Sequence, residues 1–169
     1  MALERLPAVR LRSDVERKRL FGLNALADSR ASTGDDLYSA DISQRTYLRL
    51  EELARELLQA GYTVIVDAAF LQQHERERFQ RLAAELSVPF VIASVQADNE
   101  TLRARIMQRH KAANDASEAD ITVLEKLLRT QELLLPKERG YAAYFINEGA
   151  GFAADMAGWS MMQRLLGNS

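Results

Sequence analysis

Charged side chains stand where two apolar stretches of the sequence end. Asp67 lies within residues 61–70 (GYTVIVDAAF), after a run of β-branched residues, and Asp14 follows the short strand-like run of residues 8–12. Open α/β sheets bind ligands beyond the carboxyl ends of their parallel strands, so both carboxylates are candidates for chemistry. Asp67 is either a magnesium-binding or water-ordering carboxylate, or only the cap of the helix that follows.

Asp14 lies in a charged segment, LRSDVERKRLFG, at residues 11–22. In phosphoryl transfer such an aspartate can orient or deprotonate the acceptor hydroxyl, while arginines hold an anionic substrate through bidentate contacts. We therefore take Asp14 as a candidate catalytic residue and Arg12 and Arg17 as candidate substrate-binding residues. The alternative is that these charges only form a solvated helix face.

Two further arginines, Arg105 and Arg109, are four residues apart and share one face of a helix predicted for residues 99–110. They lead into a polar segment, HKAANDASEAD, at residues 110–120. Together they can form a lid that closes over a transferring phosphate. The alternative is an ordinary amphipathic helix with snorkelling arginines. The only histidines, His74 and His110, lie in different segments, so we expect no histidine metal site.

Apolar strand-like runs alternate with helical patterns along the chain. This alternation is typical of βαβ units, so we predict an α/β fold with a parallel sheet. The run at residues 61–70 lacks the polar alternation of a half-exposed strand, so helices should cover both of its faces. The preceding helix should be capped by Asp41 or Ser43 and stopped by Gly61. We predict strands at 8–12, 63–70, 90–97 and 141–147, and helices at 1–6, 14–21, 41–60, 72–86, 99–110 and 121–135. A closing helix follows, one face of which carries Phe152, Met156, Trp159 and Met162.

The composition is that of one globular domain. The chain has 169 residues, of which 47% are hydrophobic and 27% charged. The net charge of −2 gives no general attraction to nucleic acid or to an anionic membrane, so any phosphate binding must be local. Cysteine is absent, which excludes disulfides and thiolate metal sites and fits a cytoplasmic protein. No apolar run approaches the roughly 18 residues of a transmembrane helix, so we expect no membrane partner.

Four ordered blocks of the sequence carry a resemblance to a known family. They are LRSDVERKRLFG, the run RTYLRLEELARELLQAGYTVIVDAAFL at residues 45–71, ERERFQRLAAELSVPF at residues 75–90, and DASEAD at residues 115–120. Together they resemble the P-loop kinase-like ATP-binding domain of AAA type, over about residues 1–135. This domain is often fused behind aminoglycoside-phosphotransferase-like domains and is related to polynucleotide kinases and gluconate-kinase-like enzymes.

The resemblance implies a single domain, residues 1–169, with a three-layer α/β/α parallel sheet and a lid at residues 110–120. It also implies ATP and magnesium as cofactors and a small-molecule or nucleotide ligand. Asp14 then matches the acceptor-side aspartate with Arg17 beside it, and Asp67 takes the Walker-B-like place, reaching magnesium through water. The lid provides the other candidates: Arg105 and Arg109 as catalytic arginines, and Asp115 and Ser117 as cofactor-binding residues.

The sequence departs from the family in one respect. The phosphate-binding signature G-x-x-x-x-G-K-[ST] does not occur in it. The chain resembles the family from within the first helix onwards, so we expect the first strand and the loop to be missing from it. We therefore interpret it as an N-terminally truncated remnant or fragment of an ATP-dependent phosphotransferase that is inactive alone. ATP and magnesium are then cofactors of the complete fold, or of none of this chain's own sites, and an upstream domain or fusion partner is an expected partner. The alternative is a non-catalytic module that binds an anionic ligand or a partner protein.

The missing strand also leads to a structural expectation. In P-loop kinases of this class, that strand lies between the two that match residues 63–70 and 90–97. Its loss would leave those neighbours about 10 Å apart, twice the spacing of paired strands. A buried, unpaired strand edge is unfavourable. We therefore predict that residues 63–70 and 90–97 pair directly.

Overall fold

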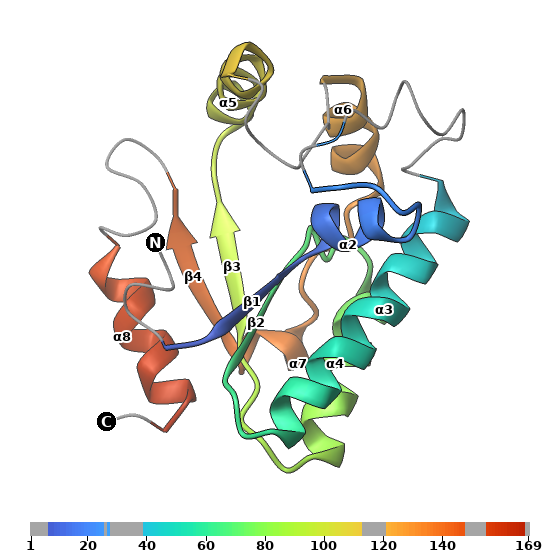
Figure 1. Ribbon diagram of the computed structural model, residues 1–169. Coiled ribbons are helices and arrows are strands. Elements are labelled where there is room, and N and C mark those ends of the chain that lie inside the picture. Colours follow the sequence, from blue (N-terminus) through green and yellow to red (C-terminus); the bar gives the residue numbers. More distant parts are fainter. Residues whose placement is uncertain (1–6, 26, 28–38, 113–120, 148–154, 168–169) are drawn as a thin grey trace.

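The computed structural model describes residues 7–25, 27, 39–112, 121–147 and 155–167, without the side chains of residues 109–112. The helix predicted at residues 1–6, most of the lid and Phe152 therefore lie outside the described residues. Strands and helices alternate as predicted, in a mixed α/β fold (Figure 1). The elements are β1 (Val9–Arg12), α2 (Ser13–Arg19), α3 (Ala40–Gln59), β2 (Val64–Asp67), α4 (Gln73–Glu85), β3 (Ile92–Gln96), α5 (Asn99–Ala112), α6 (Ile121–Thr130), α7 (Pro136–Arg139), β4 (Ala142–Ile146) and α8 (Met156–Leu165).

The ends of α3 follow from local hydrogen bonds. Ser39 caps the helix, because its hydroxyl accepts a hydrogen bond from the backbone N–H of Ile42 at 3.4 Å. The predicted cap at Asp41 or Ser43 is therefore wrong, since both lie inside the helix. The predicted stop is confirmed: Gly61 follows the last turn with a φ of +84°, a conformation that glycine adopts without strain.

The helix predicted for residues 121–135 is shorter in the structure. α6 ends at Thr130, and a separate turn of helix, α7, begins at Pro136. Between them the backbone N–H of Glu132 donates to the carbonyl of Leu71 at 2.8 Å. This long-range bond draws the chain away from the helix axis and onto the loop after β2.

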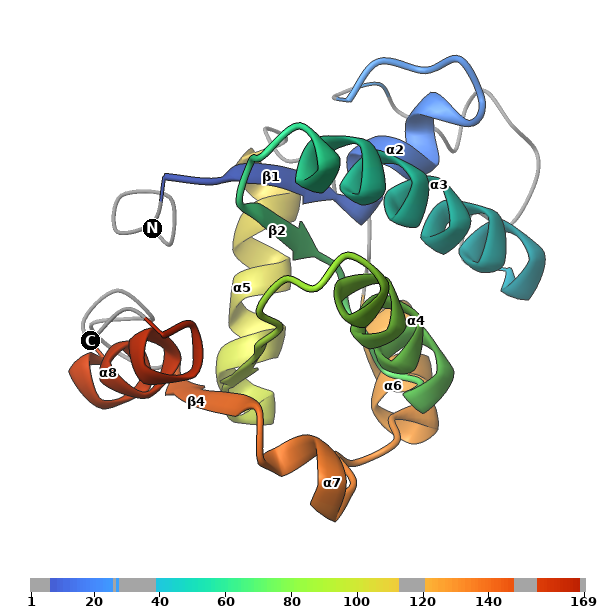
Figure 2. The ribbon, with the colours of Figure 1, turned by 90° about the horizontal axis from the view of Figure 1, so that it is seen from below.

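The four described strands form two separate parallel pairs. β1 pairs with β2, with Val9 opposite Val64 and Arg12 opposite Asp67, and β3 pairs with β4. Figure 2 shows β2 between β1 and the β3–β4 pair. β2 and β3 are not hydrogen-bonded to each other, so the predicted direct pairing of residues 63–70 with 90–97 is wrong.

Each pair is anchored by its own hydrophobic core, which explains why the pairs stay apart. In the first core, Leu11 packs with the buried faces of α3 and α4, including Leu50 and Leu82. In the second, Phe145 of β4 packs against Trp159 and its neighbours on α8, as predicted for that tryptophan. Seen from below, α8 and α3 with α4 lie on opposite sides of the strands (Figure 2).

β2 is less buried than its sequence predicts. Every residue of β2 is partly exposed, and Tyr62 just before it is 57% exposed. The apolar sequence suits a central strand, but among the described strands β2 has a hydrogen-bonded neighbour on one edge only. The full burial expected of a strand covered on both faces is not found in β2, because all four of its residues are partly exposed.

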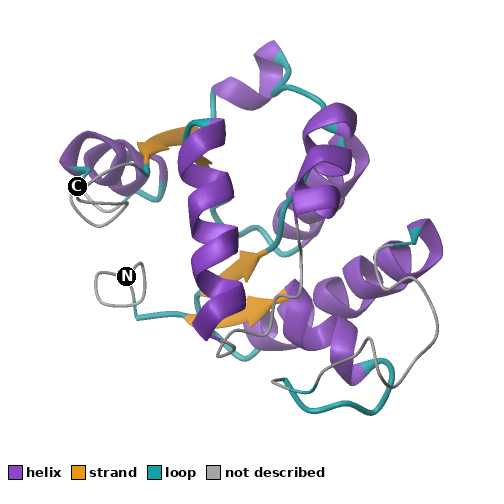
Figure 3. Ribbon diagram, turned by 90° about the horizontal axis from the view of Figure 1, so that it is seen from above, coloured by secondary structure: helices purple, strands orange, loops and turns teal. Residues whose placement is uncertain are grey.

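α5 lies beyond the carboxyl ends of the strands (Figure 1). Seen from above, it extends from the β3–β4 pair toward β1 (Figure 3). Among the described helices, none is long and apolar enough to cross a membrane.

Candidate functional site at the carboxyl ends of the strands

Asp67 and Arg12 lie side by side at the carboxyl ends of β2 and β1. The parallel register pairs them, and the Arg12 Nε lies 3.8 Å from the Asp67 Oδ2. Arg10, two residues earlier on the same face of β1, donates to this oxygen through Nε at 3.0 Å and also through Nη2. The sequence pointed to Arg12 and Asp67 but missed Arg10, although the alternation of Arg10, Leu11 and Arg12 places both arginines on one face.

The alternative role of Asp67, as the cap of the next helix, is wrong. α4 begins at Gln73, and its N-cap is Gln72, five residues beyond Asp67. The Asp67 side chain is instead 42% exposed at the strand end. Its position fits a ligand-binding edge.

The Asp67 site does not form a magnesium site from the described residues alone. Mg²⁺ requires near-octahedral oxygen coordination. Within the described residues no three histidine, aspartate or glutamate side chains cluster in a way that could hold a metal ion. One Asp67 oxygen is already bonded to Arg10. Nucleotide phosphates and water would have to supply the other ligands, and Arg10 would have to move.

Asp14 and Arg17 form an ion pair on the first turns of α2. The Arg17 Nη1 lies 2.6 Å from the Asp14 Oδ1, and the Asp14 side chain remains 24% exposed. Lys18 is buried and donates to the carbonyls of Ala25 and Ala27 at 3.2 and 2.7 Å. The charges of this segment are thus partly internal, so the alternative of a solvated face is wrong for Arg17 and Lys18.

Tyr47 of α3 holds the loop that follows Asp67. Its hydroxyl accepts a hydrogen bond from the Phe70 N–H at 3.0 Å, and its ring packs 5.4 Å from the Phe70 ring. Phe70 has a φ of +48°, which is rare for a bulky residue and is maintained here by these contacts.

Burial raises the pKa of Tyr47 well above its usual range, the Glu75 carboxylate raises it further, and Arg17 acts in the opposite direction. Tyr47 thus connects α3 to the loop after β2. No sequence motif indicated this contact.

Arg105 connects α5 to the second strand pair. Its Nη2 donates to the carbonyl of Asn147, one residue beyond β4, at 2.8 Å. Arg105 therefore lies at the same carboxyl edge as Arg12 and Asp67. The side chain of Arg109 and the whole of Asp115 and Ser117 lie outside the described residues.

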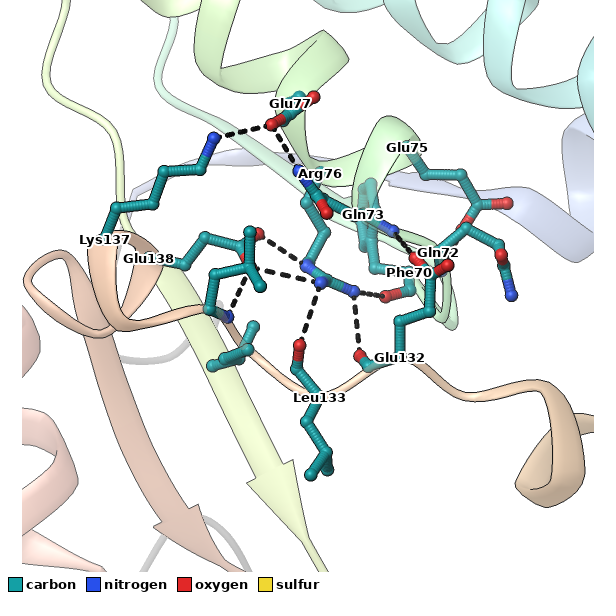
Figure 4. A network of polar contacts seen from close by, with 12 residues as sticks. Phe70, Gln72, Gln73, Glu75, Arg76, Glu77, Glu132, Leu133, Lys137 and Glu138 are labelled. Atoms are coloured by element: carbon teal, nitrogen blue, oxygen red, sulfur yellow. Dashed lines mark hydrogen bonds and ion pairs between the residues drawn. The ribbon is translucent and has the colours of Figure 1, made fainter.

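Arg76 and Glu138 form a second polar network, which sequence analysis did not identify (Figure 4). Both side chains are almost fully buried, and the Arg76 Nε and Nη2 bond the two carboxylate oxygens of Glu138 at 2.7 and 3.1 Å. Arg76 also donates to the carbonyls of Phe70 and Glu132 at 3.0 and 3.3 Å. This network joins α4, α7 and the loop after β2, so it supports the site without facing it.

Comparison with protein-family models shows which family this chain belongs to. A family model described as an AAA domain matches residues 1–134. The chain belongs to this AAA domain family. A separate search among curated proteins found no match.

The AAA domain family is P-loop kinase-like, so the resemblance in the sequence is confirmed at this level. The fold agrees with it, because short parallel strands alternate with helices. The match covers β1 to α6 and ends just before α7, so β4 and α8 lie beyond it. The family indicates a kinase-like nucleotide-binding domain.

Proposed function

We propose that this chain is a remnant or fragment of an ATP-dependent phosphotransferase that retains the acceptor side of a P-loop kinase-like domain. The observation that carries the proposal is the pairing of Asp14 with Arg17 and of Asp67 with Arg12 at the carboxyl ends of two adjacent parallel strands. The chain belongs to a family of P-loop kinase-like domains, which supports nucleotide binding at this edge. In the proposed complete fold, ATP and magnesium are the cofactors.

The charge of this edge supports a phosphate-containing ligand. Two carboxylates, Asp14 and Asp67, face an excess of arginines, which include Arg10, Arg12 and Arg17. Arginine binds phosphate oxygens in bidentate geometry, so a local cationic excess favours an anionic ligand even though the whole chain carries −2.

In this proposal Asp14 orients or deprotonates the acceptor hydroxyl, and Arg12 and Arg17 bind the substrate. Asp67 interacts with the magnesium ion through water. When the lid closes, Arg105 and Arg109 bind the transferring phosphate. Asp115 and Ser117 then bind the nucleotide. The proposed setting is cytoplasmic, with a small-molecule or nucleotide ligand and an upstream domain as a further partner.

In this proposal the 169 residues have no phosphotransferase activity by themselves. They contain no G-x-x-x-x-G-K-[ST] sequence, so the backbone amides and the lysine that hold the terminal phosphates are not available within them. Loss of preorganised donors of this kind costs roughly a hundredfold or more in rate.

Restoring the missing part tests the proposal. A strand followed by a G-x-x-x-x-G-K-S loop is fused before Met1, and its lysine-to-alanine variant serves as the control. We expect ATP turnover only with the intact loop, and a loss of about a hundredfold or more in kcat with Asp14→Asn. Full activity of the fused Asp14→Asn variant would contradict the role given to this carboxylate. An in-frame loop motif encoded directly upstream of Met1 would support the fragment origin.

A second candidate function is a non-catalytic module that binds an anionic ligand or a partner protein. The observation that favours it is that Asp14 and Asp67 each already bond an arginine, which lowers their availability as base and metal ligand. Calorimetry distinguishes the two candidates: saturable binding of an anionic ligand such as pyrophosphate without ATP or magnesium, together with inactivity of the fused protein, favours the module.

A further inference from the structure

One face of the β1–β2 pair carries three charged side chains. Side chains alternate between the two faces of a strand, and Leu11 and Val66, which are opposite each other in the register, pack in the first core. Arg10, Arg12 and Asp67 therefore lie on the other face. Their side chains are 35%, 30% and 42% exposed, so this face is open to small ions.

The guanidinium groups of Arg10 and Arg12 approach the same oxygen of Asp67. Arg10 reaches the Asp67 Oδ2 diagonally across the strand pair and donates to it through Nε at 3.0 Å and also through Nη2. The Nε of Arg12, which is directly opposite Asp67 in the register, lies 3.8 Å from this oxygen. Two guanidinium groups thus face one carboxylate, and the three side chains together carry a net positive charge.

This charge distribution is unfavourable for a divalent metal ion. Mg²⁺ and Mn²⁺ bind carboxylate oxygens, directly or through a bound water molecule. A net positive charge around Asp67 repels such an ion. The guanidinium group of Arg10 also occupies the hydrogen-bonding position at Oδ2 that the ion or its water would need. The Asp67 carboxylate is therefore already bound to a cation that belongs to the chain.

The stability of the fold does not account for a second arginine at this oxygen. The β1–β2 pair is held by its backbone ladder and by the packing of Leu11 in the first core. A partly exposed ion pair contributes little to stability. Arg12 alone already places a positive charge near Asp67. The main effect of Arg10 is therefore on which ions Asp67 can bind.

We propose that Arg10 is an internal competitor that excludes divalent metal ions from Asp67. The inference deepens the proposed function and rests on it for the role of Asp67 as the carboxylate on the metal side. It adds a regulatory contact to that site, because Arg10 has to leave the carboxylate before a metal ion can bind there.

An NMR titration with Mn²⁺ tests the proposal. The probe is MnCl₂ alone, added to the isotope-labelled chain at constant ionic strength, because bound Mn²⁺ broadens the signals of nearby amides. We expect Arg10→Gln to lower the Mn²⁺ concentration that halves the Asp67 amide signal by at least about tenfold, since one positive charge beside a doubly charged ion is removed. Arg10→Met, which also removes the charge, should show the same shift.

Two controls localise the effect. Arg55→Gln removes an arginine of similar exposure, 36%, that is bonded to Glu85 at 2.7 Å, and it should leave the titration of the Asp67 signal unchanged. Arg10→Gln combined with Asp67→Asn keeps the loss of positive charge but removes the carboxylate, so the gain in Mn²⁺ binding should disappear.

Two results would overturn the inference. Equal Mn²⁺ titrations of the unaltered chain, Arg10→Gln and Arg10→Met would mean that Arg10 does not compete with the metal ion. A gain that persists in the double variant would mean that the ion binds away from Asp67. The titration contains no ATP, so inactivity of the fused protein would reject the proposed function without altering this result.

Discussion

The ion pair of Arg76 and Glu138 is the most deeply buried charged contact among the described residues. Burying two charges is unfavourable unless both are well bonded, and here each guanidinium nitrogen donates to a carboxylate or carbonyl oxygen. Because Arg76 also bonds the Phe70 carbonyl, this pair stabilises the loop that follows Asp67.

Glu138→Gln should therefore lower the free energy of unfolding by about 3 kcal/mol, since removing one charge leaves the Arg76 guanidinium buried and uncompensated. Urea denaturation followed by circular dichroism measures this change. The control is Glu85→Gln, which breaks an exposed ion pair with Arg55 and should cost less than about 1 kcal/mol. Equal effects of the two substitutions would contradict the structural role of the buried pair.

The ionisation of Glu138 predicts that the free energy of unfolding depends on pH. Hydrogen bonding from Arg76 holds the pKa of Glu138 below its usual range. The stabilisation is therefore complete above the unfolded-state pKa of about 4.3 and is lost as the pH falls through the lower, folded-state pKa. We expect the difference in unfolding free energy between the unaltered chain and Glu138→Gln to shrink as the pH falls from about 6 to about 3. A constant difference over this range would contradict the prediction.

At the scale of elements, α8 packs so closely on β4 that one of its positions requires glycine. A Cβ built on Gly158 would lie 2.5 Å from the Phe145 Cδ1 and 2.6 Å from the Tyr144 carbonyl oxygen. Side chains in real structures do not approach this closely, so a larger residue must displace the helix.

Gly158→Ala should lower the free energy of unfolding by about 2 kcal/mol, because overpacking outweighs the better helix propensity of alanine. The loss should also change the near-UV signal of Trp159, which packs on Phe145. Gly140→Ala is the control, since its Cβ would meet only the Lys137 carbonyl oxygen at 3.8 Å. A neutral or stabilising effect of Gly158→Ala would show that α8 packs less tightly on β4.

The sequence predicted the elements well where local patterns decide them. Apolar periodicity placed α3, α4 and the four described strands, and Gly61 marked the end of α3. The errors have nonlocal causes. α6 ends early because Glu132 bonds the distant Leu71 carbonyl, and Ser39 caps α3 from a position outside the predicted helix.

The candidate site could be predicted only in part, for the same reason. Asp14 and Asp67 were found because strand ends are visible in the sequence. The contact of Arg10 with Asp67 joins residues 57 positions apart, and Tyr47 is 23 residues from Phe70. Such contacts depend on strand register and helix packing, which a single sequence does not show.

At the scale of the whole molecule, the two strand pairs are the main departure from expectation. The prediction of direct pairing considered only the cost of an open edge. It did not consider that β2 is tied to α3 and α4 while β4 is tied to α8, so closing the gap would disrupt two cores. The two separate pairs accord with the proposed function, in which the 169 residues alone are inactive because their sequence contains no phosphate-binding loop motif.

Isothermal titration calorimetry with Mg·ATP on the purified 169-residue chain tests that account most directly. The absence of a phosphate-binding loop predicts no saturable binding at millimolar ATP, and no ATP turnover in the same sample. Saturable binding at one site per chain, or turnover at the roughly 1–100 s⁻¹ typical of kinases, would contradict it.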